Sequence, residues 1–126
     1  LALYKLATLH SSRSKEKNGF RESNERLEYL GDAILGAAVA DYLFKKYPFK
    51  DEGFLTEIRS RIVNRESLNN LAKKVGVASI IQFDSKNVQL QKVILGNTLE
   101  ALVGAIYLDK GYLRTKKFVI DKLIQP

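Results

Sequence analysis

The sequence contains no cysteine, only two prolines, one histidine and no long hydrophobic run. The absence of cysteine excludes disulfide bonds, a thiol nucleophile and zinc sites with cysteine ligands. No apolar run reaches the roughly 18 residues that a membrane-spanning helix needs, and no amino-terminal signal pattern is visible. We therefore expect no membrane association and predict a cytoplasmic location, with which a cysteine-free chain is compatible.

Most catalytic motifs are missing as well. The sequence has no HExxH, GxSxG, phosphate-loop or dinucleotide-binding pattern, so we expect no organic cofactor. The one histidine, His10, lies in the segment TLHSS, and no Ser-His-Asp order can be assembled around it. Capping or packing explains this residue better than catalysis does.

What the sequence does contain is a basic chain of 126 residues, 45% hydrophobic, with a net charge of +7. This length predicts one domain, residues 1–126, with a real hydrophobic core. We expect a fragment of a longer protein, because the sequence does not begin with methionine. The basic charge suits a polyanion partner through counterion release, although many proteins without a nucleic-acid role are equally basic.

Apolar residues recur with a period near 3.6 throughout, and this pattern predicts an all-α, compact multi-helix fold. We expect a helix that ends at Tyr47 because Pro48 follows, with Ser23 or Asn24 as its amino-terminal cap. The other expected helices cover residues 1–9, 53–63, 66–75, 88–109 and 113–124, with a loop at 11–23. The stretch 77–83 resembles a strand but has nothing to pair with, so we predict a short turn followed by a loop.

The most informative segment is NERLEYLGDAIL, residues 24–35. Its acidic residues Glu25, Glu28 and Asp32 are spaced i, i+3 and i+7, which places three carboxylates on one stripe of a helix. Most acidic stripes are solvated helix faces. This helix is otherwise largely apolar, however, so its carboxylates should lie at the edge of a core and need a cation nearby.

A second segment, VILGNTLEALVGAIYLDKG at residues 93–111, complements the first. It is apolar at helical spacing, and its middle carries Asn97 and Glu100 as i, i+3 neighbours. Small residues on both helices would let the two backbones approach closely. They are Gly31, Gly36, Ala37 and Ala40 on the first helix and Gly96, Ala101, Gly104 and Ala105 on the second. We expect the carboxylates of Glu28, Asp32 and Glu100 to lie close enough to share one cation, with Asn97 beside them. Oxygen ligands of this kind favour Mg²⁺, with Mn²⁺ as an alternative.

These two segments resemble the signature motifs of the ribonuclease III endonuclease domain. The family's helix reads close to ERLEFLGDAxL, matched by ERLEYLGDAIL at residues 25–35. Its second block, close to GDxxEAxxGAxYLDxG, is matched by GNTLEALVGAIYLDKG at residues 96–111. The intervening residues 51–76 resemble the family's linking helices, so the resemblance covers nearly the whole chain in the right order.

The resemblance implies a homodimeric, divalent-metal-dependent endonuclease that cleaves double-stranded RNA. It implies metal binding and catalysis by Glu28, Asp32 and Glu100, with Asn97 assisting. Glu25 and Glu52 would be secondary acidic residues that orient ligands or line the approach. Tyr29 occupies the position at which the family's aromatic residue enters a socket on the second subunit, although core packing is the alternative role for it. Staggered cuts would leave 5′-phosphate and 3′-hydroxyl ends.

One residue departs from the family pattern, because Asn97 stands where aspartate is usual. Asparagine keeps an oxygen ligand but removes one negative charge. The chain is therefore either an active variant that relies on Glu28, Asp32 and Glu100, or a weakened form that serves as a dimeric RNA-binding or assembly module. A helical interaction domain with no nucleic-acid role is a more remote alternative. No double-stranded-RNA-binding domain is recognisable in this sequence.

Overall fold

The computed structural model describes residues 2–8, 16–17, 20–21, 24–76 and 88–124. Their order is α1 (Ala2–Ala7), β1 (Glu16–Lys17), β2 (Phe20–Arg21), α2 (Glu25–Lys46), α3 (Glu52–Ile62), α4 (Arg65–Lys74), α5 (Val88–Lys110), α6 (Tyr112–Phe118) and the π-helical η3 (Val119–Ile124). The predicted all-α fold is confirmed. The one exception is the two-residue antiparallel pair of β1 and β2, which lies within the segment expected to be a loop.

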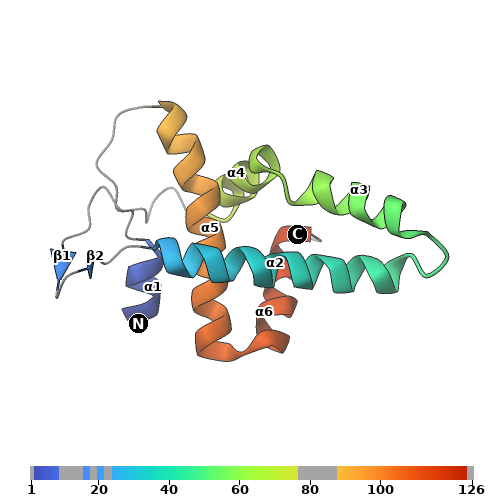
Figure 1. Ribbon diagram of the computed structural model, residues 1–126, viewed down its shortest axis with the longest axis horizontal. Helices are drawn as coiled ribbons and strands as arrows, with labels where there is room; N and C mark the ends of the chain where they lie inside the picture. Colours follow the sequence, from blue (N-terminus) through green and yellow to red (C-terminus); the bar gives the residue numbers. More distant parts are fainter. Residues whose placement is uncertain (1, 9–15, 18–19, 22–23, 77–87, 125–126) are drawn as a thin grey trace.

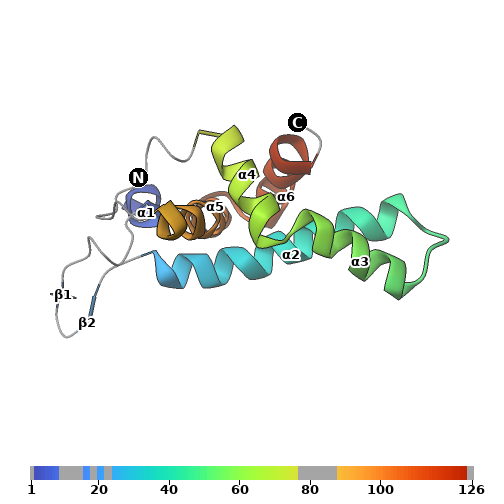
Figure 2. The same cartoon turned by 90° about the horizontal axis from the view of Figure 1, so that it is seen from above.

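Two long helices, α2 and α5, cross each other and organise the rest of the molecule (Figure 1). Helices α4 and α6 pack beside α5, whereas α3 runs back along the carboxyl-terminal half of α2 (Figure 2). The helix ends follow local chemistry. Asp51 caps α3 by accepting the N–H of Phe54 at 2.9 Å, and Asn64 caps α4 by accepting that of Ser67 at 2.8 Å. Gly76 follows α4 with a φ of 81°, as predicted for the glycine that closes this helix.

Ser23 or Asn24 is the predicted cap of α2, and Asn24 occupies the N-cap position, whereas Ser23 lies outside the described residues. Asn24 does precede α2, but its side chain makes no capping hydrogen bond. Its Nδ2 instead donates to the carbonyl oxygen of Ala7 at 2.9 Å, in a buried position. The amide therefore ties the start of α2 to the end of α1, since a buried polar group needs a partner wherever one is available.

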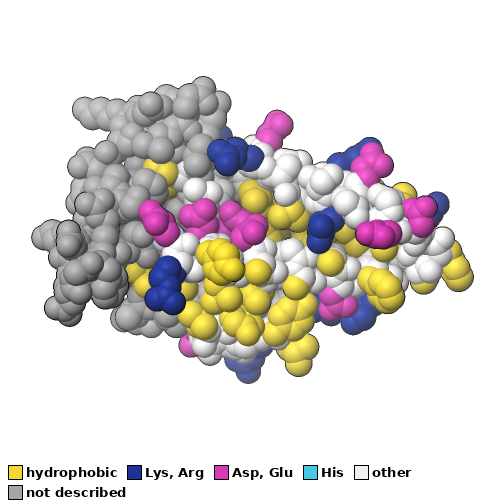
Figure 3. Space-filling model, in the orientation of Figure 1, with side chains coloured by type: hydrophobic (Ala, Val, Ile, Leu, Met, Phe, Trp, Pro, Cys, Tyr) yellow, Lys and Arg dark blue, Asp and Glu magenta, His cyan; other side chains and the backbone are white. Residues whose placement is uncertain are grey.

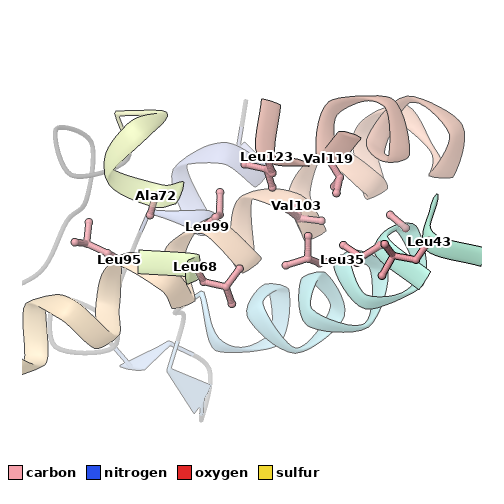
Figure 4. Close-up of a cluster of buried hydrophobic side chains, with 11 residues drawn as sticks. Leu35, Leu43, Leu68, Ala72, Leu95, Leu99, Val103, Val119 and Leu123 are labelled. Atoms are coloured by element: carbon pink, nitrogen blue, oxygen red, sulfur yellow. The ribbon is translucent and has the colours of Figure 1, made fainter. Parts of the chain in front are cut away.

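The core lies where α2, α4, α5 and η3 meet (Figure 4). Its main buried side chains are Leu35, Leu43, Leu68, Leu99, Val103, Val119 and Leu123. A smaller cluster of Ala7, Leu27, Ala101 and Ala105 holds α1 against the crossing. Burying each large aliphatic side chain contributes about 1.5–3 kcal/mol. The core therefore fixes α5 between α2 and α4, the arrangement on which the position of the acidic residues depends.

The predicted turn at residues 77–81, the predicted loop at 82–87 and His10 lie outside the described residues. In the part of the chain that is described, no helix is sufficiently long and apolar to span a bilayer.

Candidate functional site

The crossing of α2 and α5 is a backbone-to-backbone contact between glycines. A Cβ atom added to Gly31 would overlap the carbonyl oxygen of Glu100 and would lie 2.9 Å from the amide nitrogen of Gly104. A Cβ added to Gly104 would overlap the carbonyl oxygen of Leu27 and would lie 3.2 Å from the nitrogen of Gly31. The prediction that these small residues permit a close approach is confirmed. The contact brings one turn of each signature segment together.

Glu100 is the buried acid of the crossing, with only 8% of the residue exposed. The pKa of its carboxyl is raised to about 8, chiefly by burial and then by a hydrogen-bonding contact with Asp32 and the charges of Asp32 and Glu28. The charge of Arg65 acts in the opposite direction. A carboxyl next to a second carboxyl cannot easily ionise in a poorly hydrated place. Asp32 of α2 and Glu100 of α5 therefore form a close pair across the helix crossing.

Glu28 lies beside this pair and is half-buried. Burial raises the pKa of Glu28, and so do the charges of Glu25 and Asp32, whereas Arg65 again lowers it. Glu25, the first residue of α2, is exposed at the outer end of the stripe. Figure 3 shows acidic side chains in a row along the amino-terminal half of α2, with hydrophobic side chains below them. The predicted acidic stripe thus forms one edge of the crossing.

The expectation of a ready-made cluster of three carboxylates is not met. Within the described ranges, no group of three or more acidic or histidine side chains is gathered closely enough to hold a metal ion. Asp32 and Glu100 are in contact, whereas Glu28 influences them through its charge. Mutual repulsion opposes the gathering of three carboxylates. The donor set still fits magnesium, because Mg²⁺ keeps several waters and is usually held by one or two carboxylates.

Asn97 and Glu52 differ in how the structure places them. Asn97 lies on α5, half-buried, one helical turn before Glu100, so its amide is on the same side of α5 as the acid. Glu52 is the first residue of α3 and follows the far end of α2 (Figure 1). At about 1.5 Å per residue, that end lies roughly 20 Å beyond Asp32. Within one chain, the structure therefore does not bring Glu52 to the other acids.

Arg65 is the site residue that sequence reasoning missed. It is the first residue of α4, exposed, and its charge lowers the pKa of both Glu28 and Glu100. In the sequence it is one of 21 basic residues, without a distinguishing spacing. Only the packing of α4 on α5 brings its positive charge to the acidic residues.

Tyr29 is on the outer surface of α2, with 82% of the residue exposed. Core packing within the chain, the alternative role for this aromatic residue, is therefore excluded. One turn further along α2, Ala33 is one of the residues that line a surface cleft of about 500 Å³ between α2 and α3. The cleft is lined by Asp32, Ala33, Gly36, Ala37 and Ala40 from α2 and by Thr56, Arg59, Ser60 and Val63 from the α3 side.

Comparison with known proteins identifies the family. A family model described as "Ribonuclease-III-like" matches residues 2–126. Ribonuclease 3 of Azobacteroides pseudotrichonymphae is 52% identical over 99% of this chain and 48% of its own length. Ribonuclease 3 of Phocaeicola vulgatus is 47% identical over 100% of this chain and 41% of its own length. The chain thus spans about half the length of the curated relatives it matches.

Solved structures of similar proteins lead to the same family. The nuclease domain of ribonuclease III from Campylobacter jejuni, for which a region involved in dimer formation is described, superimposes with a TM-score of 0.85 at 32% identity. That match covers 97% of this chain and 85% of the other. Dicer from Pichia stipitis superimposes with a TM-score of 0.73 at 27% identity, over 99% of this chain and 53% of that protein. The chain therefore belongs to the ribonuclease III-like family, and its fold is that of the family's nuclease domain.

Proposed function

We propose that this chain is the catalytic domain of a divalent-metal-dependent endoribonuclease that cleaves double-stranded RNA. The observation that carries the proposal is the pairing of Asp32 with Glu100 across the glycine contact of α2 and α5, with Glu28 beside them. Paired carboxylates at the edge of a core are costly unless a cation or a proton balances them. In a chain of this family, the simplest reason to retain them is catalysis.

Each acidic residue has a distinct part in this proposal. Asp32 and Glu100 would be the direct ligands of Mg²⁺, or of Mn²⁺. Together with Glu28 they would be the catalytic residues. Asn97 would contribute its amide oxygen from the same side of α5. The bound ion would supply Lewis acidity at the scissile phosphate and a lowered pKa for the attacking water. Attack on phosphorus would break the P–O3′ bond, leaving a 5′-phosphate and a 3′-hydroxyl.

The protonation of Glu100 matters for this chemistry. With a pKa near 8, Glu100 holds a proton at neutral pH in the metal-free protein. A ligand carboxyl must release that proton when the cation binds, so ion uptake and proton release are coupled. Arg65, close enough to lower the pKa of Glu100, eases this release. Glu25 would orient waters at the outer end of the stripe.

The proposed enzyme is a homodimer with one site per subunit. Tyr29, exposed beside the α2–α3 cleft, would enter that cleft on the second copy, as the family resemblance implies. An aromatic ring buries about 150–250 Å² and anchors interfaces well. Because Tyr29 and the cleft lie on the same chain, a two-fold symmetric dimer would contain this contact twice. Two sites related in this way would cut the two strands at staggered positions.

Duplex RNA would be bound through its backbone and shape, because its deep major groove hides the base edges. Exposed basic residues on the described surface, such as Arg26, Lys73 and Lys74, are available for phosphate contacts. Glu52, at the start of α3, could reach a site only on a second copy or line the approach of the RNA. This substrate would place the protein in the cytoplasm.

The decisive experiment incubates a long RNA duplex and Mg²⁺ with the wild type, Glu100→Gln and Asn97→Asp. We expect the wild type to cut, and Glu100→Gln to lose roughly 100-fold or more in kcat, because it removes an ionisable ligand. Asn97→Asp should cut at least as fast as the wild type, since it adds a negative ligand. Asn70→Asp is a matched control, because it makes the same chemical change at an exposed position of α4.

The second candidate function is a weakened, dimeric RNA-binding or assembly module, and Asn97 is the observation that favours it. In that case the wild type would bind the duplex and leave it intact, and Asn97→Asp would restore cleavage. If no variant cuts and none binds duplex RNA, the RNA assignment itself is wrong.

A further inference from the structure

Helix α4 is joined to α5 by one buried hydrogen bond between a side chain and the backbone. Oδ1 of Asn69 accepts the N–H of Gly96 at 3.0 Å, and Asn69 is only 9% exposed. A backbone N–H within a helix ordinarily donates to the carbonyl four residues earlier. An acceptor from a neighbouring helix at this position is therefore a tertiary contact that local helix formation does not require.

Gly96 makes this contact possible. A Cβ atom at this position would lie 2.8 Å from Oδ1 of Asn69 and 3.4 Å from Cβ of Leu68. The first distance is too short for a carbon–oxygen contact, so any larger residue would push the Asn69 amide away. Leu68 and Ala72 of the same helix are buried in the core. Helix α4 thus rests directly on the turn of α5 that begins at Gly96.

That turn of α5 carries the functional residues of the second signature segment. Asn97 follows Gly96 directly, and Glu100 lies one turn later. On the other helix, Arg65 lies four residues before Asn69, so the two share one face of α4. The Asn69–Gly96 contact therefore lies one turn from Arg65 on α4 and one turn from Glu100 on α5.

We propose that Asn69 is a positioning residue of the carboxylate site: its bond to the Gly96 N–H fixes α4 on α5 and thereby places Arg65 opposite Glu28 and Glu100. This inference rests on the proposed endonuclease function. Apolar contacts such as those of Leu68 and Ala72 are not directional and tolerate sliding. A hydrogen bond requires a narrow range of distance and angle, so it specifies the register of the two helices.

The first test compares Asn69→Ala with Asn70→Ala. Asn70 is the adjacent asparagine on α4 and is exposed, so it receives the same chemical change outside the contact. In the magnesium-loaded chain acting on duplex RNA, Asn69→Ala should lower kcat about tenfold and change KM by less than about twofold. The Gly96 amide proton should exchange with solvent at least tenfold faster. Asn70→Ala should change neither quantity.

A double-mutant cycle tests whether Asn69 acts through Arg65. Arg65→Ala should lower kcat by itself, and Asn69→Ala/Arg65→Ala should be no worse than Arg65→Ala, because the residue to be positioned is gone. A purely structural role for Asn69 predicts instead that the two losses multiply. Multiplied losses would overturn the positioning role.

A second double variant separates the hydrogen bond from packing. In Asn69→Ala/Gly96→Ala, the new methyl group fills the space that the shortened side chain leaves. We expect Tm to return to within about 2 °C of the wild type while kcat stays low. Recovery of kcat together with Tm would show that only packing matters, which contradicts the proposal.

Failure of this inference is distinguishable from failure of the proposed function. If the wild type and Asn70→Ala cut duplex RNA and Asn69→Ala cuts equally well, the positioning role is wrong and the endonuclease stands. If the wild type itself does not cut, the endonuclease proposal fails and the positioning role fails with it, whatever the exchange rate at Gly96 shows.

Discussion

The two halves of α2 differ sharply in what surrounds them. The amino-terminal half passes over α5 at the Gly31–Gly104 contact, where a single added carbon would overlap backbone. The carboxyl-terminal half buries one face in the core through Ala38, Val39 and Leu43, and its other face forms an arm with α3. No residue of α3 is fully buried, and Gly36 of α2 has open space around its missing Cβ. The contacts at the crossing are all made within one chain. The arm leaves apolar surface that a second copy could cover.

Exposed aromatic side chains lie in the arm and on the outer face of the amino-terminal half of α2. Phe44 and Phe49 in the arm are 70% and 97% exposed, and Tyr29 on that outer face is 82% exposed. At the crossing, Leu27, Leu35 and Leu99 are buried. Large exposed apolar residues in one region indicate an interaction surface. We infer that catalysis depends on the crossing within one chain, and assembly on the α2–α3 side.

The largest expected effect comes from Gly31→Ala compared with Gly36→Ala. At Gly31 the new methyl group meets backbone of α5, which cannot rotate away, so we expect a loss of more than about 4 kcal/mol or failure to fold. At Gly36 the methyl group meets nothing, and alanine favours the helix by up to about 1 kcal/mol. Urea denaturation of both variants measures the difference. Equal stabilities would contradict the contrast between crossing and arm.

The sequence was sufficient to predict the helices and the close approach of α2 and α5, but not which glycine of α2 makes the contact. Helical periodicity, Pro48 and Gly76 are local signals, and they placed the ends of α2 and α4 to within one or two residues. Small residues alone did not distinguish Gly31, which touches α5, from Gly36, which does not. That distinction depends on where along α2 the second helix crosses, a property of the packed core.

The residues that could not be predicted act through tertiary contacts. Arg65 and Asn69 matter because α4 docks on α5, and no spacing within the chain reveals that docking. Asn24 has the residue type of a helix cap, yet its amide binds Ala7 because burial there offers a better acceptor. The carboxylates of the stripe were identified from their spacing, but the contact of Asp32 with Glu100 required the structure.

The second prediction, smaller in free energy, concerns the proposed dimer surface on the outer side of α2. Tyr29→Ala should weaken the proposed dimer about 30-fold or more, the effect of losing an interface anchor worth about 2 kcal/mol. It should leave the stability of the dilute chain nearly unchanged, because Tyr29 is exposed within one copy. Leu113→Ala is the matched control, because Leu113 is a 79% exposed apolar residue on α6, outside the α2–α3 side, and its loss should not change association. Sedimentation velocity over a concentration series measures both, and unchanged association of Tyr29→Ala would rule out its role as the anchor.

The smallest expected effect is the pH dependence of stability in EDTA. Glu100 has a pKa of about 8 in the folded chain, against about 4.5 when unfolded. Between these values the folded state holds the proton and the unfolded state does not, so stability falls as pH rises from about 4.5 to 8. Glu28, whose pKa is also raised, acts in the same direction. Glu100→Gln removes the larger contribution and should flatten the curve.

The free energy of unfolding of Glu100→Gln, taken relative to that of the wild type, should therefore rise by at least about 1 kcal/mol from pH 5 to pH 8. For a chain of this size this corresponds to about 3–5 °C in Tm. Glu57→Gln is the matched control from the arm, because that carboxylate is exposed on α3 and its loss should change stability by less than about 0.5 kcal/mol. Parallel curves for the wild type and Glu100→Gln would mean that Glu100 is ionised at neutral pH without a metal. Arg65 would then have to balance the negative charge of Glu100 at the crossing.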